Sequence, residues 1–162
     1  MRFLSAACFT TILLLLLPAC SKRPAKVGPC ELLQLGEAQS IDGAIVKTQS
    51  YPPQKGEELC VYLDQGGEGR LMLFVWRDKR SDPASAVRAG MKSPSDRVVE
   101  VAGIGSAAAA GFSVSEGGVL KLLAAESAAG MVGLRVRDPV KEGDEKFNGV
   151  KTLAAKALAR LK

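Results

Sequence analysis

The run Leu71-Met72-Leu73-Phe74-Val75-Trp76 is apolar at every position. Successive side chains of a β-strand point to opposite faces of a sheet, so this run presents apolar residues on both faces. Strands of that kind are covered on both sides, whereas half-exposed strands alternate between apolar and polar residues. We therefore expect residues 69–77 to form a central strand.

Outward from this strand, turn signals and apolar spacing predict six further strands and three helices. The strands are expected at residues 44–48, 58–64, 97–102, 109–115, 119–126 and 131–137. The helices are expected at residues 30–41, at residues 83–91 and after the charged loop at residues 138–144. This order predicts an α+β domain, with a mainly antiparallel sheet of about six or seven strands and two or three helices packed on it.

Local signals set the limits of several elements. Asp82 and Pro83 form a strong helix start, because aspartate caps helices and proline suits the first turn. The segment Tyr51-Pro52-Pro53 is expected to be a turn between the first two strands. Leu32, Leu33, Leu35 and Ile41 are expected to be buried by the first helix. The last helix has an apolar stripe that should pack on the sheet, made of Phe147, Val150, Ala154, Ala157, Leu158 and Leu161.

The first 20 residues predict export and lipid attachment. Arg2 precedes an apolar run over residues 9–17, which ends in Leu17-Pro18-Ala19-Cys20. The run is shorter than the roughly 20 residues of a membrane span and fits a signal peptide. Its last four residues resemble the lipobox of bacterial lipoproteins, which implies cleavage before Cys20 and acylation of that residue. An ordinary secretory signal, with a chance cysteine after Ala19, is the alternative.

Cleavage before Cys20 divides the chain into three parts. Residues 1–19 are the expected signal peptide, residues 20–29 a flexible tether, and residues 30–162 a single α+β domain. Two or three acyl chains anchor a small domain almost permanently. The expected location is therefore the bacterial cell envelope, lipid-anchored and facing the extracytoplasmic side.

Two cysteines remain in the domain, Cys30 and Cys60, because Cys8 leaves with the signal peptide and Cys20 carries lipid. Two thiols in an oxidising compartment are expected to pair as a disulfide. A metal site is the alternative, but zinc needs further Cys or His ligands, and the chain has no histidine.

The charge balance argues against nucleic acid as a partner. The chain has 22 Lys and Arg residues against 17 Asp and Glu residues, and the two signs are mixed along the sequence. Aromatic residues make up 5% of the chain, too few for a platform on which bases stack.

The segment Gly103-Ile104-Gly105-Ser106-Ala107-Ala108 matches the Gly-x-Gly-x-x-Ala pattern of dinucleotide-binding loops. Such a loop works only where a helix follows, because the helix amides hold the pyrophosphate. Here residues 111–115 alternate as a strand does. We therefore expect a tight structural turn and no cofactor.

Catalytic signals are weak. Without histidine, the usual Ser-His and Cys-His pairs are excluded. Acid–base carboxylates are the other option, and the candidates are Glu57, Glu58, Glu142, Asp144 and Glu145. Adjacent acids in polar loops are usually solvated, so we expect no enzyme activity.

Four stretches taken together resemble a family of small two-cysteine envelope lipoproteins of unknown function, best represented in actinobacteria. They are Pro29-Cys30-Glu31-Leu32-Leu33, Cys60-Val61-Tyr62, residues 101–108, and the last helix with Leu153, Leu158 and Leu161. The resemblance covers about residues 29–162. It implies a sheet with helices on one face, as in Mog1, PsbP-like or TBP-like folds, and no known enzymatic activity. The chain departs from the pattern at Ser106, where Asp is common, and in its long charged loop before the last helix.

The expected function is that of a non-catalytic, lipid-anchored binding module for an envelope protein, a cell-wall component or a small apolar ligand. An apolar pocket between sheet and helices would favour ligand binding. An exposed apolar patch would instead favour a structural accessory subunit, and two carboxylates across one cleft a hydrolase. Trp76 is expected to pack in the core, with a position beside a binding surface as the alternative.

Overall fold

The computed structural model describes residues 26–78 and 81–162. Residues 1–25, which include Cys20 and most of the expected tether, lie outside this description. None of the helices among the described residues is long and apolar enough to cross a membrane. The described strands and helices lie between residues 29 and 160, and their buried apolar side chains form one larger and one smaller cluster.

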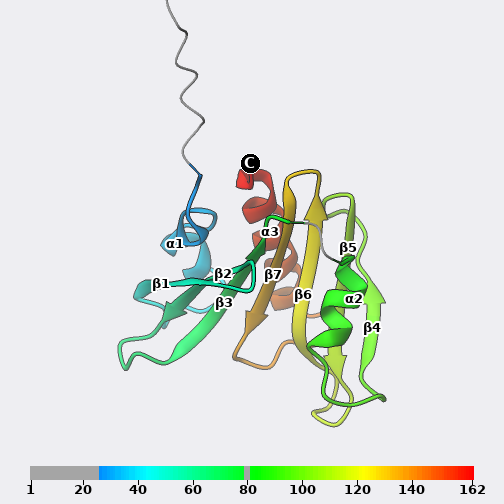
Figure 1. Ribbon diagram of the computed structural model, residues 1–162. Helices are drawn as coiled ribbons and strands as arrows, with labels where there is room; N and C mark the ends of the chain where they lie inside the picture. The colour runs from blue at the N-terminus through cyan, green and yellow to red at the C-terminus, as the bar shows by residue number, and fades with distance from the viewer. Residues whose placement is uncertain (1–25, 79–80) are drawn as a thin grey trace, which may run out of the picture.

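The fold is α+β, with a seven-stranded antiparallel sheet and three α-helices packed on it (Figure 1). Strand order is β1-β2-β3-β7-β6-β5-β4, so that two meanders meet where β3 pairs with β7. The strands are β1 (Lys47–Gln54), β2 (Glu57–Leu63), β3 (Gly69–Trp76), β4 (Arg97–Glu100), β5 (Ala107–Ser113), β6 (Val119–Ser127) and β7 (Gly130–Val136). The predicted central strand is β3, which lies between β2 and β7.

The helices lie on both faces of the sheet, which differs from the single covered face that the family resemblance implies. On one face α3 (Glu145–Arg160) packs on β6 and β7, while the 3-10 helix η1 (Pro29–Glu31) contacts β1, β2 and β3. The short helix α1 (Leu35–Gln39) joins the core on this face. On the opposite face α2 (Pro83–Ala89) packs on β4, β5 and β6 (Figure 1).

The two faces of β3 are buried to different degrees. Leu71, Leu73 and Val75 are fully buried, and they belong to the main core beneath η1 and α3. Met72, Phe74 and Trp76 alternate with them and are only half-buried. The reason is that α2 covers β4, β5 and β6 but not β1, β2 and β3.

Small residues let α2 approach the sheet closely. A Cβ atom on Gly111 would lie 2.6 Å from Cγ1 of Val87 and 2.7 Å from the sulfur of Met91. The predicted start of α2 is confirmed, because the Ser85 amide donates a 2.9 Å hydrogen bond to the Asp82 carboxylate.

The helix predicted at residues 30–41 is wrong as a continuous element. It is broken between η1 and α1, where Leu32 and Leu33 are both fully buried. Their carbonyls accept bonds from distant side chains, Arg160 at 3.1 Å and the Tyr62 hydroxyl at 2.6 Å. Those tertiary bonds replace the next turn of a helix.

The predicted turn at Tyr51-Pro52-Pro53 is also wrong, because these residues belong to β1. β1 is an edge strand with every residue exposed, and an edge tolerates proline because its outer amides pair with nothing. The β1–β2 register shifts between Tyr51 and Gln54. The chain instead turns at Lys55 and Gly56, which both have positive φ.

The predicted disulfide is present. Cys30 and Cys60 are bonded, with their Cα atoms 5.1 Å apart. The bond joins η1 to β2 at the start of the folded part of the chain.

Candidate functional site

A groove of 510 Å³ lies between α2 and the part of the sheet that α2 leaves uncovered. Its apolar lining comes from β3, α2, β6 and β7. These residues are Phe74, Trp76, Ala86, Ala89, Leu122 and Met131. Its volume falls in the range of about 300–1,000 Å³ that is usual for small-molecule sites.

The floor of the groove is aromatic. The rings of Phe74 and Trp76 stack with centroids 5.9 Å apart and planes inclined by 14°. Met131 lies opposite Trp76 in the β3–β7 register, and Gly133 lies opposite Phe74. Gly133 has no side chain, so the β7 backbone leaves room for the indole ring.

Trp76 combines the two positions that the sequence left open. It packs on the small cluster beneath α2 that contains Val87 and Met131. It is also half-buried and lines the groove. Core packing of Trp76 is therefore borne out in part, because α2 does not extend over the end of β3 and leaves one side of the ring open to the groove.

Charged residues line the two ends of the groove. Glu57 lies opposite Trp76 in the β2–β3 register. Lys92, Lys121 and Arg135 line the other end, where Lys121 forms an ion pair with Glu116. The groove therefore has one apolar end with an acidic residue, and one end where three cations outnumber two carboxylates, Glu116 and Asp96.

Asp96 also lines the groove, but its contacts indicate a structural role. The carboxylate accepts hydrogen bonds from the amides of Ser93, at 3.1 Å, and Val114, at 3.2 Å. Burial acts to raise the pKa of Asp96, and these hydrogen bonds outweigh it, so the pKa lies below its usual value. The residue is a hydrogen-bonded carboxylate that holds the segment after α2 against β5.

The five candidate carboxylates of the sequence do not gather in one place. Glu57 lines the groove. Glu58 is buried and pairs with Arg77 and Lys26, and Glu142 pairs with Arg97. Asp144 is the N-cap residue of α3 and accepts a 2.9 Å bond from the Lys141 amide. Glu145 follows it, exposed, in the first helical turn.

The Gly-x-Gly segment is a tight turn, as predicted. It joins β4 to β5, so that a strand follows it where a dinucleotide site would need a helix. Gly105 has φ of 59°, and a Cβ atom there would lie 2.1 Å from the Glu126 carbonyl oxygen. The Ser106 amide donates a 2.8 Å bond to that same carbonyl. Close packing against β6 therefore explains both the glycine at position 105 and the tight turn of the backbone there.

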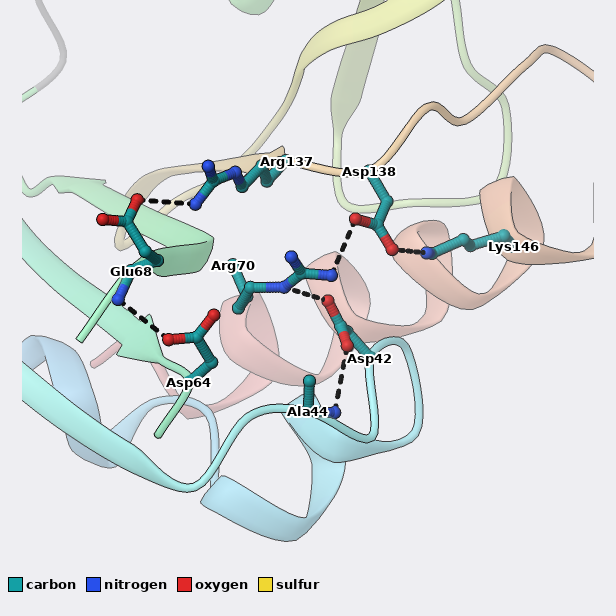
Figure 2. A network of polar contacts seen from close by, with 8 residues as sticks. All are labelled: Asp42, Ala44, Asp64, Glu68, Arg70, Arg137, Asp138 and Lys146. Atoms are coloured by element: carbon teal, nitrogen blue, oxygen red, sulfur yellow. Dashed lines mark hydrogen bonds and ion pairs between the residues drawn. The ribbon is translucent and has the colours of Figure 1, made fainter. Parts of the chain in front are cut away.

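A polar network centred on Arg70 lies at the other end of β3 (Figure 2). Arg70 donates to Asp42 at 2.6 Å and to Asp138 at 2.8 Å, and Asp138 also accepts from Lys146 at 3.0 Å. Burial acts to raise the pKa of Asp42, but the bonds from Arg70 and the Ala44 amide outweigh it and lower the pKa. The network ties the loop after α1 to β3, to the loop after β7 and to α3, and we interpret it as structural.

Within residues 26–78 and 81–162, no cluster of three or more Cys, His, Asp or Glu side chains could hold a metal ion. Comparison of the chain with protein-family models, with curated proteins and with solved structures finds no match. The groove is therefore interpreted from its own chemistry.

Sequence reasoning missed Lys92, Lys121 and Arg135 as site residues. Each belongs to a different element, and they come together only because α2 folds back over β5 and β6. A local signal did exist for the floor, since Phe74 and Trp76 share one face of a strand whose other face fills the core.

Proposed function

We propose that this chain is a lipid-anchored domain of the bacterial envelope that binds a small apolar ligand in the groove beneath α2, without catalysing a reaction. The observation that carries the proposal is the aromatic floor, Phe74 and Trp76, held half-buried in a cavity of small-molecule size. Large apolar residues are costly to leave open to water, and an apolar ligand would cover them.

The distribution of exposed apolar residues favours a ligand over a structural accessory role. Among the described residues, the large apolar side chains that are exposed are Val46, Tyr51 and Val114. The first two lie at the β1 edge and the third lies in the loop after β5. They form no continuous patch of the kind that marks a protein interface.

The anchor part of the proposal rests on Leu17-Pro18-Ala19-Cys20. Cys20→Ala should abolish acylation and leave unprocessed precursor, detected by mass spectrometry and by metabolic labelling with a fatty acid. Precursor that is still cleaved and released at the wild-type rate would show an ordinary secretory signal.

The ligand part is tested with residues 21–162 and a neutral apolar dye, N-phenyl-1-naphthylamine, whose fluorescence rises in apolar surroundings. We expect saturable binding with one site per chain. Phe74→Ala should weaken it at least about tenfold, because burying a Phe side chain is worth about 1.5–3 kcal/mol. Tyr51→Ala is the matched control, since Tyr51 is an aromatic strand residue outside the groove.

Circular dichroism and thermal unfolding would establish that both variants are folded. An unsaturable wild-type signal, or a folded Phe74→Ala variant with unchanged affinity, would contradict the proposed function.

A further inference from the structure

We infer that the ligand of the groove is a single-chain amphiphile with an acidic head group, bound with its head beside Arg135 and its chain over Trp76. The inference rests on the proposed function, because it names the class of ligand for the same groove. It depends on the charges at one end, the aromatic rings at the other, and the position of the tether.

The cationic end offers two unpaired positive charges. Arg135 lies on β7 opposite Met72, and Lys92 follows the end of α2. Both line the groove and are exposed. Neither forms an ion pair or a side-chain hydrogen bond with another residue of the part that the structure describes. An acidic head group would supply the partner, because charge-assisted hydrogen bonds are the strong ones.

These two cations lie at the same end of the groove. A Cβ atom on Gly90, two residues before Lys92, would lie 3.8 Å from Leu122. Leu123 pairs with Leu134 in the β6–β7 register, so Leu122 and Arg135 are the next residues of the two strands. Lys121 also lines this end, but Glu116 already neutralises it.

The aromatic end suits the chain and not the head. Trp76 is four residues along β3 from Met72, which places it about 13 Å from the level of Arg135. Glu57 lies opposite Trp76, and its carboxylate would repel an acidic head there. The two ends of the groove therefore differ in charge, and this difference fixes the direction in which an acidic amphiphile binds.

The tether enters the domain at the aromatic end. Arg77 follows Trp76 and donates a hydrogen bond to the carbonyl of Val27, and Lys26 pairs with Glu58. Figure 1 shows the first described residues and the end of α3 at this same end of the sheet. The six Cα–Cα steps from Cys20 to Lys26 span at most about 22 Å. In the anchored protein, the aromatic end of the groove would therefore face the membrane. An amphiphile that left the membrane head first would then enter the groove with its head toward Arg135 and its chain toward the bilayer.

The experiment compares sodium dodecanoate with dodecanol, below the concentrations at which either aggregates, by displacement of the naphthylamine dye from residues 21–162. We expect the acid to bind about tenfold more tightly than the alcohol, as one charge-assisted contact would give. Arg135→Gln with Lys92→Gln should remove that difference by lowering the affinity for dodecanoate to that for dodecanol. Arg97→Gln with Lys47→Gln is the control for net charge, because both residues are exposed and outside the groove.

Equal affinities of acid and alcohol, or an unchanged preference in the Arg135→Gln Lys92→Gln variant, would overturn the acidic head and leave the apolar site standing. Failure of both probes to bind the wild-type domain would overturn the proposed function as well.

The direction of binding is read from Trp76, the single tryptophan of the chain. Dodecanoate brominated at its terminal carbon should quench Trp76 more strongly than dodecanoate brominated next to its carboxylate. The opposite order would contradict the proposed direction.

Discussion

The indole ring of Trp76 lies directly over the backbone of Gly133. A Cβ atom on Gly133 would lie 2.9 Å from Cη2 and Cζ3 of the indole, closer than such atoms approach in folded proteins. Gly133 therefore fixes the depth at which the tryptophan sits in the groove. Glycine is needed at position 133 for packing. A larger residue there would have to displace the rigid indole ring, which cannot bend aside as the end of a flexible side chain can.

Gly133→Ala should move the indole and reshape the groove. Overpacking of this kind costs about 1–3 kcal/mol, and we expect a shifted Trp76 emission maximum and weaker dye binding. Gly36→Ala is the control, because a Cβ atom there meets nothing within 4 Å. An unchanged emission spectrum in a folded Gly133→Ala variant would show that the ring does not rest on this residue.

Trp76→Ala and Leu73→Ala should distinguish a residue of the groove from a residue of the core by their effects on stability and on dye binding. Leu73 is fully buried, and its truncation should lower the free energy of unfolding by about 3 kcal/mol or more. Trp76 is half-buried, so its truncation should cost about 2 kcal/mol, less than a buried tryptophan. Dye binding should fall for Trp76→Ala and not for folded Leu73→Ala. Urea unfolding and dye titration measure the two quantities, and the reverse pattern would place Trp76 in the core.

The double variant Cys30→Ser Cys60→Ser should unfold at lower urea concentration. Closing a loop between residues 30 apart in sequence stabilises a fold by about 3.5 kcal/mol in the chain-entropy model. Thiol titration of the unreduced, denatured wild type should find neither cysteine free. Two reactive thiols in that assay would contradict the bond.

Glu37 should make stability depend on pH in the acid range. Arg160 donates to both carboxylate oxygens, at 2.5 and 2.9 Å, and this lowers the pKa of Glu37 to about 2, against the effect of burial. A carboxyl group whose pKa is lowered in the folded state stabilises fully above its unfolded value, near 4.5. That contribution is lost as the pH falls from about 4.5 to about 2.

Glu37→Gln should therefore be less stable than the wild type at pH 6, by about 2 kcal/mol, and nearly equal to it at pH 2. Urea unfolding at several pH values measures the difference between the two proteins. The other carboxylates with lowered pKa are present in both, and they are Asp42, Glu58, Asp82 and Asp96. A constant difference across the pH range would show that the ion pair does not stabilise the fold.

The two glycines of the β4–β5 turn should respond differently to alanine. Both have positive φ, but a Cβ atom on Gly103 meets nothing, whereas one on Gly105 collides with the Glu126 carbonyl. Gly103→Ala should cost about 1–2 kcal/mol for the backbone conformation alone. Gly105→Ala should cost about 1–3 kcal/mol more. Equal thermal unfolding of the two variants would contradict the packing role given to Gly105.

The sequence predicted the elements whose signals are local. The apolar run of β3, the Asp82-Pro83 start of α2 and the apolar stripe of α3 each depend on residues close together in the chain. The errors came where distant contacts decide the structure. Arg160 and Tyr62 break the first helix, and the edge position of β1 admits Pro52 and Pro53.

The groove could not be predicted because it depends on strand order. Met72, Phe74 and Trp76 have the composition of a buried face, and only the pairing of β3 with β7 leaves them beyond the reach of a seven-residue α2. The disulfide was predictable because the sequence offered two domain cysteines and no competing ligand. The attachment of the tether beside the end of β3 could not be predicted, because Arg77 donates to the carbonyl of Val27, which lies 50 residues earlier in the chain.

The Cys30–Cys60 bond also decides how the domain would bear mechanical force. In the proposed anchored protein, a pull on the lipid end reaches the fold at Cys30 and passes through a covalent bond to β2. Residues 31–59, which include α1 and β1, form a closed loop that such a pull cannot extend. Drag on the domain would break the contacts of Lys26 with Glu58 and of Val27 with Arg77. It would not separate β1 from β2, because the disulfide carries the force past β1.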